Sequence, residues 1–352
     1  MNTDNKALVI LTPGFPESEA DTTCLPLQQN LVLALKKNHQ DQQLIVLSFQ
    51  YPYHRVTYTW KGVQVISFNG RNRPGVTRLL TRRRVNAAMG KIKERYQITG
   101  LISFWYGECA WVGKKFADKF RLKHFVWILG QDARDGNRYP RITKAGSTEL
   151  VALSDFIQDE FERNYHIRPA HIIAPGIDPE QFATPPSIKD IDIIGVGSLI
   201  PLKQFDVFIE LIAGLKEKIP SIKVMLIGEG PERKKLEHLI NEQSLQQNIS
   251  LTGELPHEKV LLLMQRSKIL LHTSSYEGFG CVCAEALYAR ANVMSFCRPM
   301  KADIEQWHIV TDRNEMKEKA LDLLLNPSTQ YKSIKVYNID EVAEKFRQLF
   351  AK

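Results

Sequence analysis

The chain has 352 residues, of which 43% are hydrophobic, and this is enough apolar material for two separate cores. Residues 1–170 carry 25 Lys or Arg against 15 Asp or Glu, whereas residues 171–352 carry 22 against 24, so the excess positive charge lies in the first half. The five cysteines include no Cys-x-x-Cys pair, which argues against a disulfide framework and a structural zinc site and favours buried thiols at Cys281 and Cys283.

The start of the chain is polar over residues 1–6 and lacks the charged and then long apolar pattern of a secretory signal. No run approaches the roughly 18 apolar residues that suggest a membrane span. We therefore expect a cytoplasmic protein. Its basic half can bind nucleic acid, an acidic membrane or a phosphorylated substrate, and the net charge by itself does not distinguish these partners. Nucleic acid is not favoured, because the basic run lacks the interleaved aromatic residues of a single-strand platform.

The first half alternates short apolar runs with helical patterns, which predicts a parallel sheet with crossover helices. The runs that indicate buried strands are 7–12, 43–49, 100–105, 124–129 and 149–153.

A basic segment, residues 71–95, lies between the predicted strands 43–49 and 100–105 and contains nine Lys or Arg and one acid, Glu94. If Pro74 opens a helix, Arg78 and Arg82 lie on the same side as an apolar stripe. The stripe comprises Val85, Met89, Ile92 and Tyr96. Cations early in a helix oppose its dipole, so an acidic acceptor, or an anionic membrane carrying it, would account for their placement. A solvated charged face is the simpler alternative.

A domain boundary is predicted within residues 174–192, where four prolines and a glycine break regular structure. The alternation of short apolar runs with helical patterns then resumes. Strands are expected at 191–196, 222–227, 249–252, 269–273 and 292–296. Apolar residues at helical spacing predict helices over 205–215 and 341–350. Two doubly wound domains joined in this way would form a cleft, with ligands bound outside the carboxyl ends of the strands.

The segment 274–287 carries the most informative pattern, because a predicted strand leads into a loop with Gly278 and Gly280 and then into a helix. Glycines permit close backbone approach, and the N–H groups at a helix start suit a diphosphate. Glu277 and Glu285 bracket this loop, and their carboxylates can accept hydrogen bonds from sugar hydroxyls. A surface turn with two solvated glutamates is the simpler alternative.

Glu277 and Glu285, with Gly-Phe-Gly between them, resemble the Glu-x7-Glu motif of the family-4 retaining glycosyltransferases. Further matches span about residues 150–300. They are the strand and loop at 195–203, which include the basic Lys203, and the Gly-x-Gly-Pro turn at 228–231. The other two are the loop at 251–253, on the side of the nucleotide base in the family, and the interdomain turn at 174–178.

The resemblance implies an α/β protein of the GT-B type, with two Rossmann-like doubly wound domains facing across a cleft. It places an acceptor-side domain at 1–178, a nucleotide-sugar-binding domain at 179–335 and a terminal helix at 336–352 that packs back on the first domain. The implied activity is metal-independent transfer of a sugar from a nucleotide-sugar donor to a saccharide or lipid-linked acceptor, with retention of configuration and no cofactor. Glu277 would orient the donor sugar and stabilise developing positive charge, and Glu285 would hold the ribose.

The resemblance also supplies candidate site residues. Asp132 joins Glu277 as a catalytic candidate, although an Asp in a polar loop is more often a turn or cap former. The donor-binding candidates are Lys203, Ser198, Gly278, Phe279, Gly280, Glu285, Gly228 and Gly253. The acceptor-side candidates are Gly14, Arg78 and Arg82.

Several positions depart from the family pattern. Ser198 stands where many relatives have Arg, which leaves Lys203 as the only matched cation for the diphosphate. The first-domain loop 13–21 has one glycine where a pair is expected, and Leu129 stands where a histidine is common. Arg290 and Asn292 replace the usual Gly and Pro that end the predicted helix carrying Glu285. The first-domain side of the site is therefore less specified than the second.

Two other functions are compatible with parts of the pattern. A Rossmann-type NAD-dependent oxidoreductase would need Gly-x-Gly-x-x-Gly after a strand, and the turn at Gly228 and Gly230 lacks the third glycine. An inactive sugar-binding GT-B module would explain the degraded first-domain motifs. The Asp-x-Asp sequence at Asp190 and Asp192 is interpreted as a solvated strand entry and not as a metal site.

Overall fold

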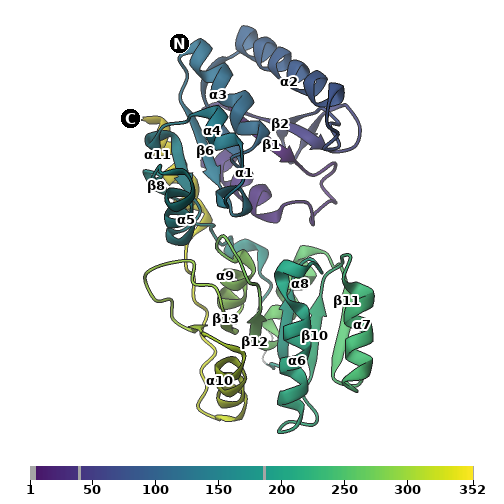
Figure 1. Ribbon diagram of the computed structural model, residues 1–352. Coiled ribbons are helices and arrows are strands. Elements are labelled where there is room, and N and C mark those ends of the chain that lie inside the picture. The colour runs from purple at the N-terminus through teal and green to yellow at the C-terminus, as the bar shows by residue number, and fades with distance from the viewer. Residues whose placement is uncertain (1–4, 39–40, 185–187, 352) are drawn as a thin grey trace. The chain divides into compact units, whose positions relative to one another are not determined.

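The computed structural model describes residues 5–38, 41–184 and 188–351. The chain divides into two compact units, one comprising Met1–Gly176 with Tyr337–Lys352 and the other Ile177–Val336. Each unit is a sheet flanked by helices (Figure 1).

The first unit contains an eight-stranded sheet in the order β3-β4-β2-β1-β5-β6-β7-β8, parallel except for the antiparallel β3–β4 pair. Its strands are β1 (Lys6–Gly14), β2 (Gln43–Tyr51), β3 (Thr57–Trp60), β4 (Val63–Ser67), β5 (Gln97–Phe104), β6 (His124–Ile128), β7 (Leu150–Ala152) and β8 (His171–Ile172). Its α-helices are α1 (Pro26–Asn38), α2 (Val76–Arg95), α3 (Glu108–Phe120), α4 (Tyr139–Thr143), α5 (Asp155–Tyr165) and α11 (Ile339–Ala351), with short 3-10 turns η2 (Gln131–Ala133) and η3 (Ser147–Glu149).

Helices cover both faces of this sheet because its strands are apolar on both sides. Helices α2 and α3 pack on the face that includes Val9 of β1, through side chains such as Met89 and Phe116. The terminal helix α11 packs on the opposite face, where the ring of Phe346 lies 5.2 Å from that of Trp127. Helix α11 is therefore part of the core of the first unit.

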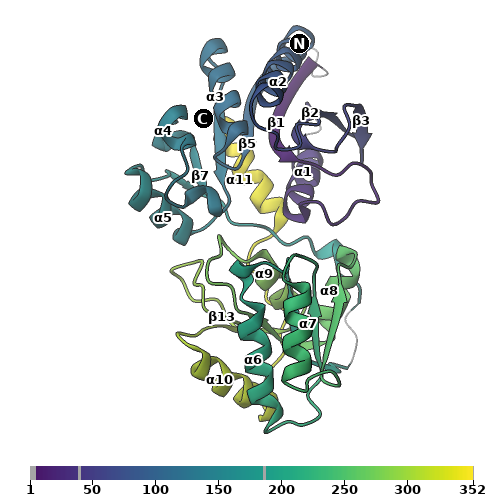
Figure 2. The same ribbon diagram turned by 45° about the vertical axis from the view of Figure 1, so that its right-hand side comes forward.

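The second unit contains a six-stranded parallel sheet in the order β11-β10-β9-β12-β13-β14. Its strands are β9 (Ile191–Val196), β10 (Val224–Ile227), β11 (Ile249–Gly253), β12 (Ser267–His272), β13 (Asn292–Ser295) and β14 (Trp307–Ile309). Its α-helices are α6 (Phe205–Lys216), α7 (Arg233–Glu242), α8 (His257–Gln265), α9 (Cys281–Tyr288) and α10 (Arg313–Leu325), with 3-10 turns η4 (Pro179–Gln181) and η5 (Pro201–Lys203). Helices α6, α7 and α10 share one apolar core with the sheet, and α6 and α7 lie side by side (Figure 2).

All ten predicted strands are confirmed, with ends shifted by at most a few residues, and so are the helices at 205–215 and 341–350. Strands β3, β4, β8 and β14 were not predicted. Pro74 does not open the basic helix, because α2 begins at Val76. Gly75, just before it, has a positive φ of 67°, which lies outside the range of a right-handed helix. Cys283 is buried as expected, whereas Cys281, the first residue of α9, is only partly buried.

Candidate functional site

The second sheet changes direction between β9 and β12. The chain adds β10 and β11 on one side of β9 and then returns to place β12 on its other side. The loops that leave the carboxyl ends of these two strands therefore diverge from a common point, which is where doubly wound sheets bind ligands. The loop after β9 carries Lys203, and the loop after β12 carries Glu277.

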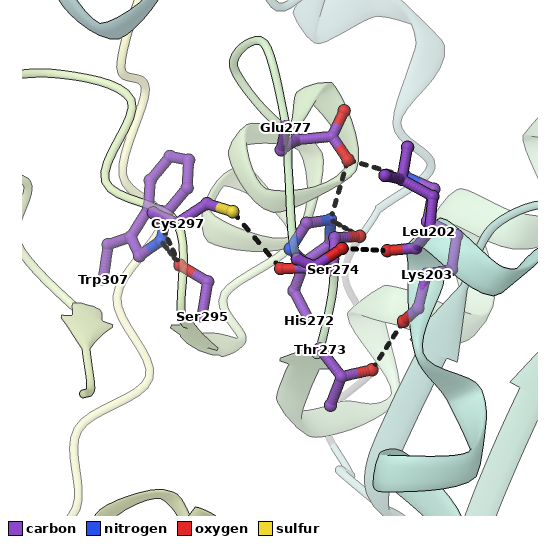
Figure 3. Close-up of polar contacts among 10 residues, drawn as sticks. Leu202, Lys203, His272, Thr273, Ser274, Glu277, Ser295, Cys297 and Trp307 are labelled. Carbon is purple, nitrogen blue, oxygen red and sulfur yellow. Dashed lines mark hydrogen bonds and ion pairs between the residues drawn. The ribbon is translucent and has the colours of Figure 1, made fainter. Parts of the chain in front are cut away.

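Two hydrogen bonds to backbone carbonyls join these two loops. Ser275 donates its N–H to the carbonyl of Leu202 (3.0 Å), and the Thr273 hydroxyl donates to the carbonyl of Lys203 (2.9 Å). Lys203 Nζ then reaches Glu277 Oε2 at 2.6 Å (Figure 3). Both side chains are about one-fifth exposed, so this ion pair is partly shielded from water.

His272 is a second partner of Glu277 that the sequence analysis missed. Its Nε2 lies 3.3 Å from Glu277 Oε2, and the side chain is only 5% exposed at the end of β12 (Figure 3). Burial alone would raise the pKa of Glu277, but the hydrogen bond from His272 and the charge of Lys203 outweigh it and lower that pKa to about 2. Glu277 is therefore a carboxylate at neutral pH and cannot serve as a proton donor.

The glycine-containing loop is anchored by its own buried side chain. Phe279 is 1% exposed and its ring packs edge to face on Trp307, with centroids 5.8 Å apart. Gly280 has φ of 83° and precedes α9 directly, so it turns the chain into the helix. Phe279 thus positions the loop from the core, while Gly278 and Gly280 are part of the loop backbone that lies between Glu277 and α9.

Glu285 also has a histidine partner. It lies on α9, and its Oε1 is 2.9 Å from Nε2 of His257, the first residue of α8. Burial opposes protonation of His257, but the hydrogen bond and charge of Glu285 prevail, so the pKa of His257 is raised. This pair was not predicted, because the two residues come from different helices.

The predicted glycines Gly228 and Gly253 follow β10 and end β11, beside the loop that follows β9. Gly228 donates its N–H to the carbonyl of Gly253 (3.0 Å), and a Cβ on Gly228 would lie 1.9 Å from the carbonyl oxygen of Gly197. Close backbone packing therefore requires glycine at 228. Ser198 is exposed in the loop after β9, on the same carboxyl edge of the sheet.

The first-unit candidates lie at the carboxyl edge of the first sheet. Gly14 ends β1 and is buried. Asp132 is 8% exposed and accepts hydrogen bonds from the N–H groups of Tyr106 (2.7 Å), Gly130 (2.7 Å) and Leu129 (3.1 Å). This is the geometry of a carboxylate that holds a turn, and its catalytic role stays a prediction.

Arg78 and Arg82 lie on the same side of α2, as predicted, and both face Glu108 at the start of α3. The nitrogen Nε of Arg82 is 2.5 Å from Glu108 Oε1, and that of Arg78 is 3.9 Å away. Gln50 donates to the other oxygen of Glu108 at 3.0 Å. The two guanidinium charges thus share one carboxylate, which leaves this cluster with a net positive charge.

The aspartates of the Asp-x-Asp sequence are held in ion pairs. Asp190 pairs with Arg266 through two bonds of 2.9 and 2.5 Å, and Asp192 pairs with Lys268 at 2.8 Å. Within residues 5–38, 41–184 and 188–351, no group of three or more His, Cys, Asp or Glu is arranged to hold a metal ion. Over those same residues, no helix is both long and apolar enough to span a bilayer.

Residues 177–338 match the family model of the glycosyl transferases group 1. The matched region coincides with the second unit, which contains the Lys203–Glu277 pair. Two curated relatives are N-acetylglucosaminyltransferases by name. The phosphatidylinositol N-acetylglucosaminyltransferase GPI3 subunit of Saccharomyces cerevisiae is 31% identical over 27% of this chain and 21% of its own length. The 2-deoxystreptamine N-acetyl-D-glucosaminyltransferase of Niallia circulans is 26% identical over 44% of this chain and 41% of its own length.

The chain thus spans less than half the length of either relative. A solved structure resembles it throughout: the Anabaena protein HepE in complex with UDP and glucose has a TM-score of 0.72 at 14% identity, over 98% of this chain and 99% of HepE. The fold is GT-B, with two α/β domains. The expected fold class is therefore confirmed.

Proposed function

We propose that the chain transfers a sugar from a nucleotide-sugar donor to a saccharide or lipid-linked acceptor, with retention of configuration and without a metal ion. The observation that carries this proposal is the ion pair between Lys203 and Glu277 at the point where the second sheet changes direction. The family match over the same unit and the names of the relatives agree with it. Neither an oxidoreductase nor an inactive module is favoured by these comparisons.

The leaving diphosphate needs positive charge, because departure of the nucleoside diphosphate builds negative charge on its oxygens. Lys203 supplies a cation, and the backbone of residues 278–280 supplies N–H groups next to the start of α9. Asp190 and Asp192, already paired with Arg266 and Lys268, are not assigned a metal-binding role. In this proposal Lys203 contacts the diphosphate and stays paired with Glu277 at the same time.

The proposed reaction keeps the anomeric configuration because attack and departure occur on the same face of the sugar. The bond from C1 to the phosphate oxygen breaks, the acceptor oxygen bonds to C1, and the acceptor proton passes to a phosphate oxygen of the leaving group. Glu277, whose pKa is about 2, keeps its negative charge throughout. It is therefore assigned to orienting the sugar and stabilising the positive charge that develops on the ring.

We propose UDP-N-acetylglucosamine as the donor. Both reported relatives are named as N-acetylglucosaminyltransferases, and the HepE structure contains UDP. His257 engages Oε1 of Glu285, and we assign Oε2 to a ribose hydroxyl. The His257 contact holds the carboxylate in one orientation, which reduces the entropy lost when the nucleoside binds.

We propose that the first unit binds the acceptor at the carboxyl edge of its sheet, near Gly14, Asp132 and the Arg78–Arg82–Glu108 cluster. The net positive charge of that cluster suits an acceptor that bears a phosphate or carboxylate. The yeast relative is named for phosphatidylinositol, which carries a phosphate.

Calorimetric titration with UDP-N-acetylglucosamine, UDP-glucose, GDP-mannose, ADP-glucose and NADH tests the donor class. We expect UDP-N-acetylglucosamine to bind best, and Lys203→Met to weaken its binding. The matched control is Lys234→Met, which removes an exposed lysine on α7. Binding of NADH without binding of any nucleotide sugar would reject the proposal in favour of an oxidoreductase. Retention is tested separately by the anomeric coupling of the product in NMR spectra.

A further inference from the structure

Helix α2 carries seven Lys or Arg and a single acid, Glu94. It lies on the outside of the first unit (Figure 1). Arg78 and Arg82 turn inward to Glu108, but Arg83, Arg84 and Lys91 are exposed and form no ion pair with any residue that the structure describes. The outward face of α2 therefore presents uncompensated positive charge that the Glu108 cluster does not explain.

A groove runs beside this face, between α2 and the β3–β4 hairpin. Its volume is about 440 Å³, and it is lined by cations from α2 and by polar and apolar residues of the hairpin. The cations are Arg84, Lys91 and Arg95, which recur at intervals of seven and four residues and so share one side of the helix. No Asp or Glu is among the lining residues, so the groove suits an anionic group such as a phosphate.

The first turns of α2 expose large apolar side chains next to these cations. Val76 is 72% exposed, Leu79 48% and Leu80 39%. Leu80 is four residues before Arg84 and lies one helical turn from it on the same side. Exposed apolar residues clustered on one helix end, beside positive charge, are typical of a surface that contacts a membrane interface.

We propose that the outward face of α2 docks on an anionic lipid bilayer, with Val76, Leu79 and Leu80 in the interface and a lipid phosphate in the groove at Arg84, Lys91 and Arg95. A bilayer uses both halves of this surface, whereas a soluble phosphate would use only the groove. Nucleic acid would contact the cations but gains nothing from the exposed leucines. The inference does not rest on the proposed transfer reaction.

Flotation of the full chain with vesicles of phosphatidylcholine alone, or mixed with equal phosphatidylglycerol, tests this surface. We expect binding to the anionic vesicles only, and weaker binding as salt is raised. Each basic residue near such a surface contributes about 1 kcal/mol, so Arg84→Ser/Lys91→Ser/Arg95→Ser should lower partitioning on the order of a hundredfold. Leu79→Ser/Leu80→Ser should lower it about tenfold.

Matched controls remove equal charge or apolar area elsewhere. Lys218→Ser/Lys234→Ser/Lys259→Ser removes three exposed lysines of the second unit, and Leu262→Ser/Leu325→Ser removes two exposed leucines. Both controls should float like wild type, and every variant should keep wild-type circular dichroism and the wild-type thermal unfolding midpoint.

The absence of binding to anionic vesicles at low salt would overturn the proposal, and so would equal losses in the test and control variants. Loss with the cation variant but not with the leucine variant would overturn the apolar contact. Displacement from vesicles by inorganic phosphate at millimolar concentration would show a soluble anion site in place of a bilayer surface. Binding to single-stranded RNA that exceeds binding to vesicles would instead assign the face to nucleic acid.

Discussion

Lys203 Nζ and Glu277 Oε2 lie 2.6 Å apart although 74 positions separate the two residues in the chain. Their loops meet because β9 and β12 are neighbours in the sheet and both loops leave the carboxyl ends. The charge of Lys203 and the hydrogen bond from His272 lower the pKa of Glu277 to about 2 despite its burial. A carboxylate held in this way is suited to stabilising positive charge and not to exchanging protons.

The first prediction concerns the charge of Glu277. Glu277→Gln keeps the shape of the side chain and removes the carboxylate, so kcat should fall roughly a hundredfold to a thousandfold while donor Kd changes much less. Steady-state rates and calorimetry measure the two effects. Glu258→Gln, at an exposed position on α8, is the matched control and should match wild type. A loss confined to Kd would assign Glu277 to donor binding alone.

The second prediction concerns the donor contacts. Lys203→Ala and Glu285→Ala each remove a group assigned to a charge-assisted hydrogen bond, which is worth about 1.5–3 kcal/mol. Donor Kd should therefore rise about tenfold to a hundredfold in each variant. Calorimetric titration with the preferred nucleotide sugar checks this. Wild-type affinity in both variants would show that the diphosphate and ribose bind elsewhere.

The third prediction follows from the raised pKa of His257. Because Glu285 favours the protonated ring in the folded state, the pair stabilises the fold fully below the unfolded histidine pKa of about 6.5. This stabilisation is lost as pH rises through the higher folded-state pKa. Urea unfolding should therefore show a larger difference in free energy between wild type and His257→Gln at pH 5.5 than at pH 9.

A double-mutant cycle provides the control for that experiment. In a Glu285→Gln background the carboxylate is absent, so His257→Gln should change the free energy of unfolding by amounts that no longer depend on pH in this way. Persistence of the same pH dependence in that background would show that another group raises the pKa of His257.

The fourth prediction is that transfer survives excess EDTA. Lys203 and the backbone N–H groups of residues 278–280 are proposed to meet the charge of the leaving diphosphate, so no metal ion is required. Initial rates with and without EDTA, after dialysis against the chelator, measure this directly. Complete loss of activity that Mn²⁺ or Mg²⁺ restores would contradict the assigned diphosphate site.

The fifth prediction compares two glycines. A Cβ at Gly228 would lie 1.9 Å from the carbonyl oxygen of Gly197, and its φ is 151°, so Gly228→Ala should destabilise the second unit by about 3 kcal/mol or more. Gly90 lies inside α2, and a Cβ there meets nothing within 4 Å, so Gly90→Ala should stabilise the fold by about 0.5–1 kcal/mol. Thermal unfolding of the two variants should therefore shift in opposite directions.

The sequence by itself determined the parts of this protein that depend on neighbouring residues. Continuous apolar runs marked the buried parallel strands, because a strand covered on both faces needs apolar side chains throughout. The loop that carries Glu277, Gly278 and Gly280 could be placed between a strand and a helix for the same local reason. The β3–β4 hairpin was not predicted, because its strands are short and β4 alternates between buried and partly buried residues instead of forming a continuous apolar run.

Tertiary structure alone decided which side chains meet. Lys203 contacts Glu277 and His257 contacts Glu285, because strand order and helix packing bring their elements together. His272 reaches Glu277 through the conformation of the loop that follows β12. Phe279 lies in the candidate motif but packs into the core on Trp307, a contact that needs β14 to be in place. A linear pattern records spacing along one strand or helix, whereas these contacts depend on the order of strands in the sheet, which hydrogen bonding and packing between distant segments establish.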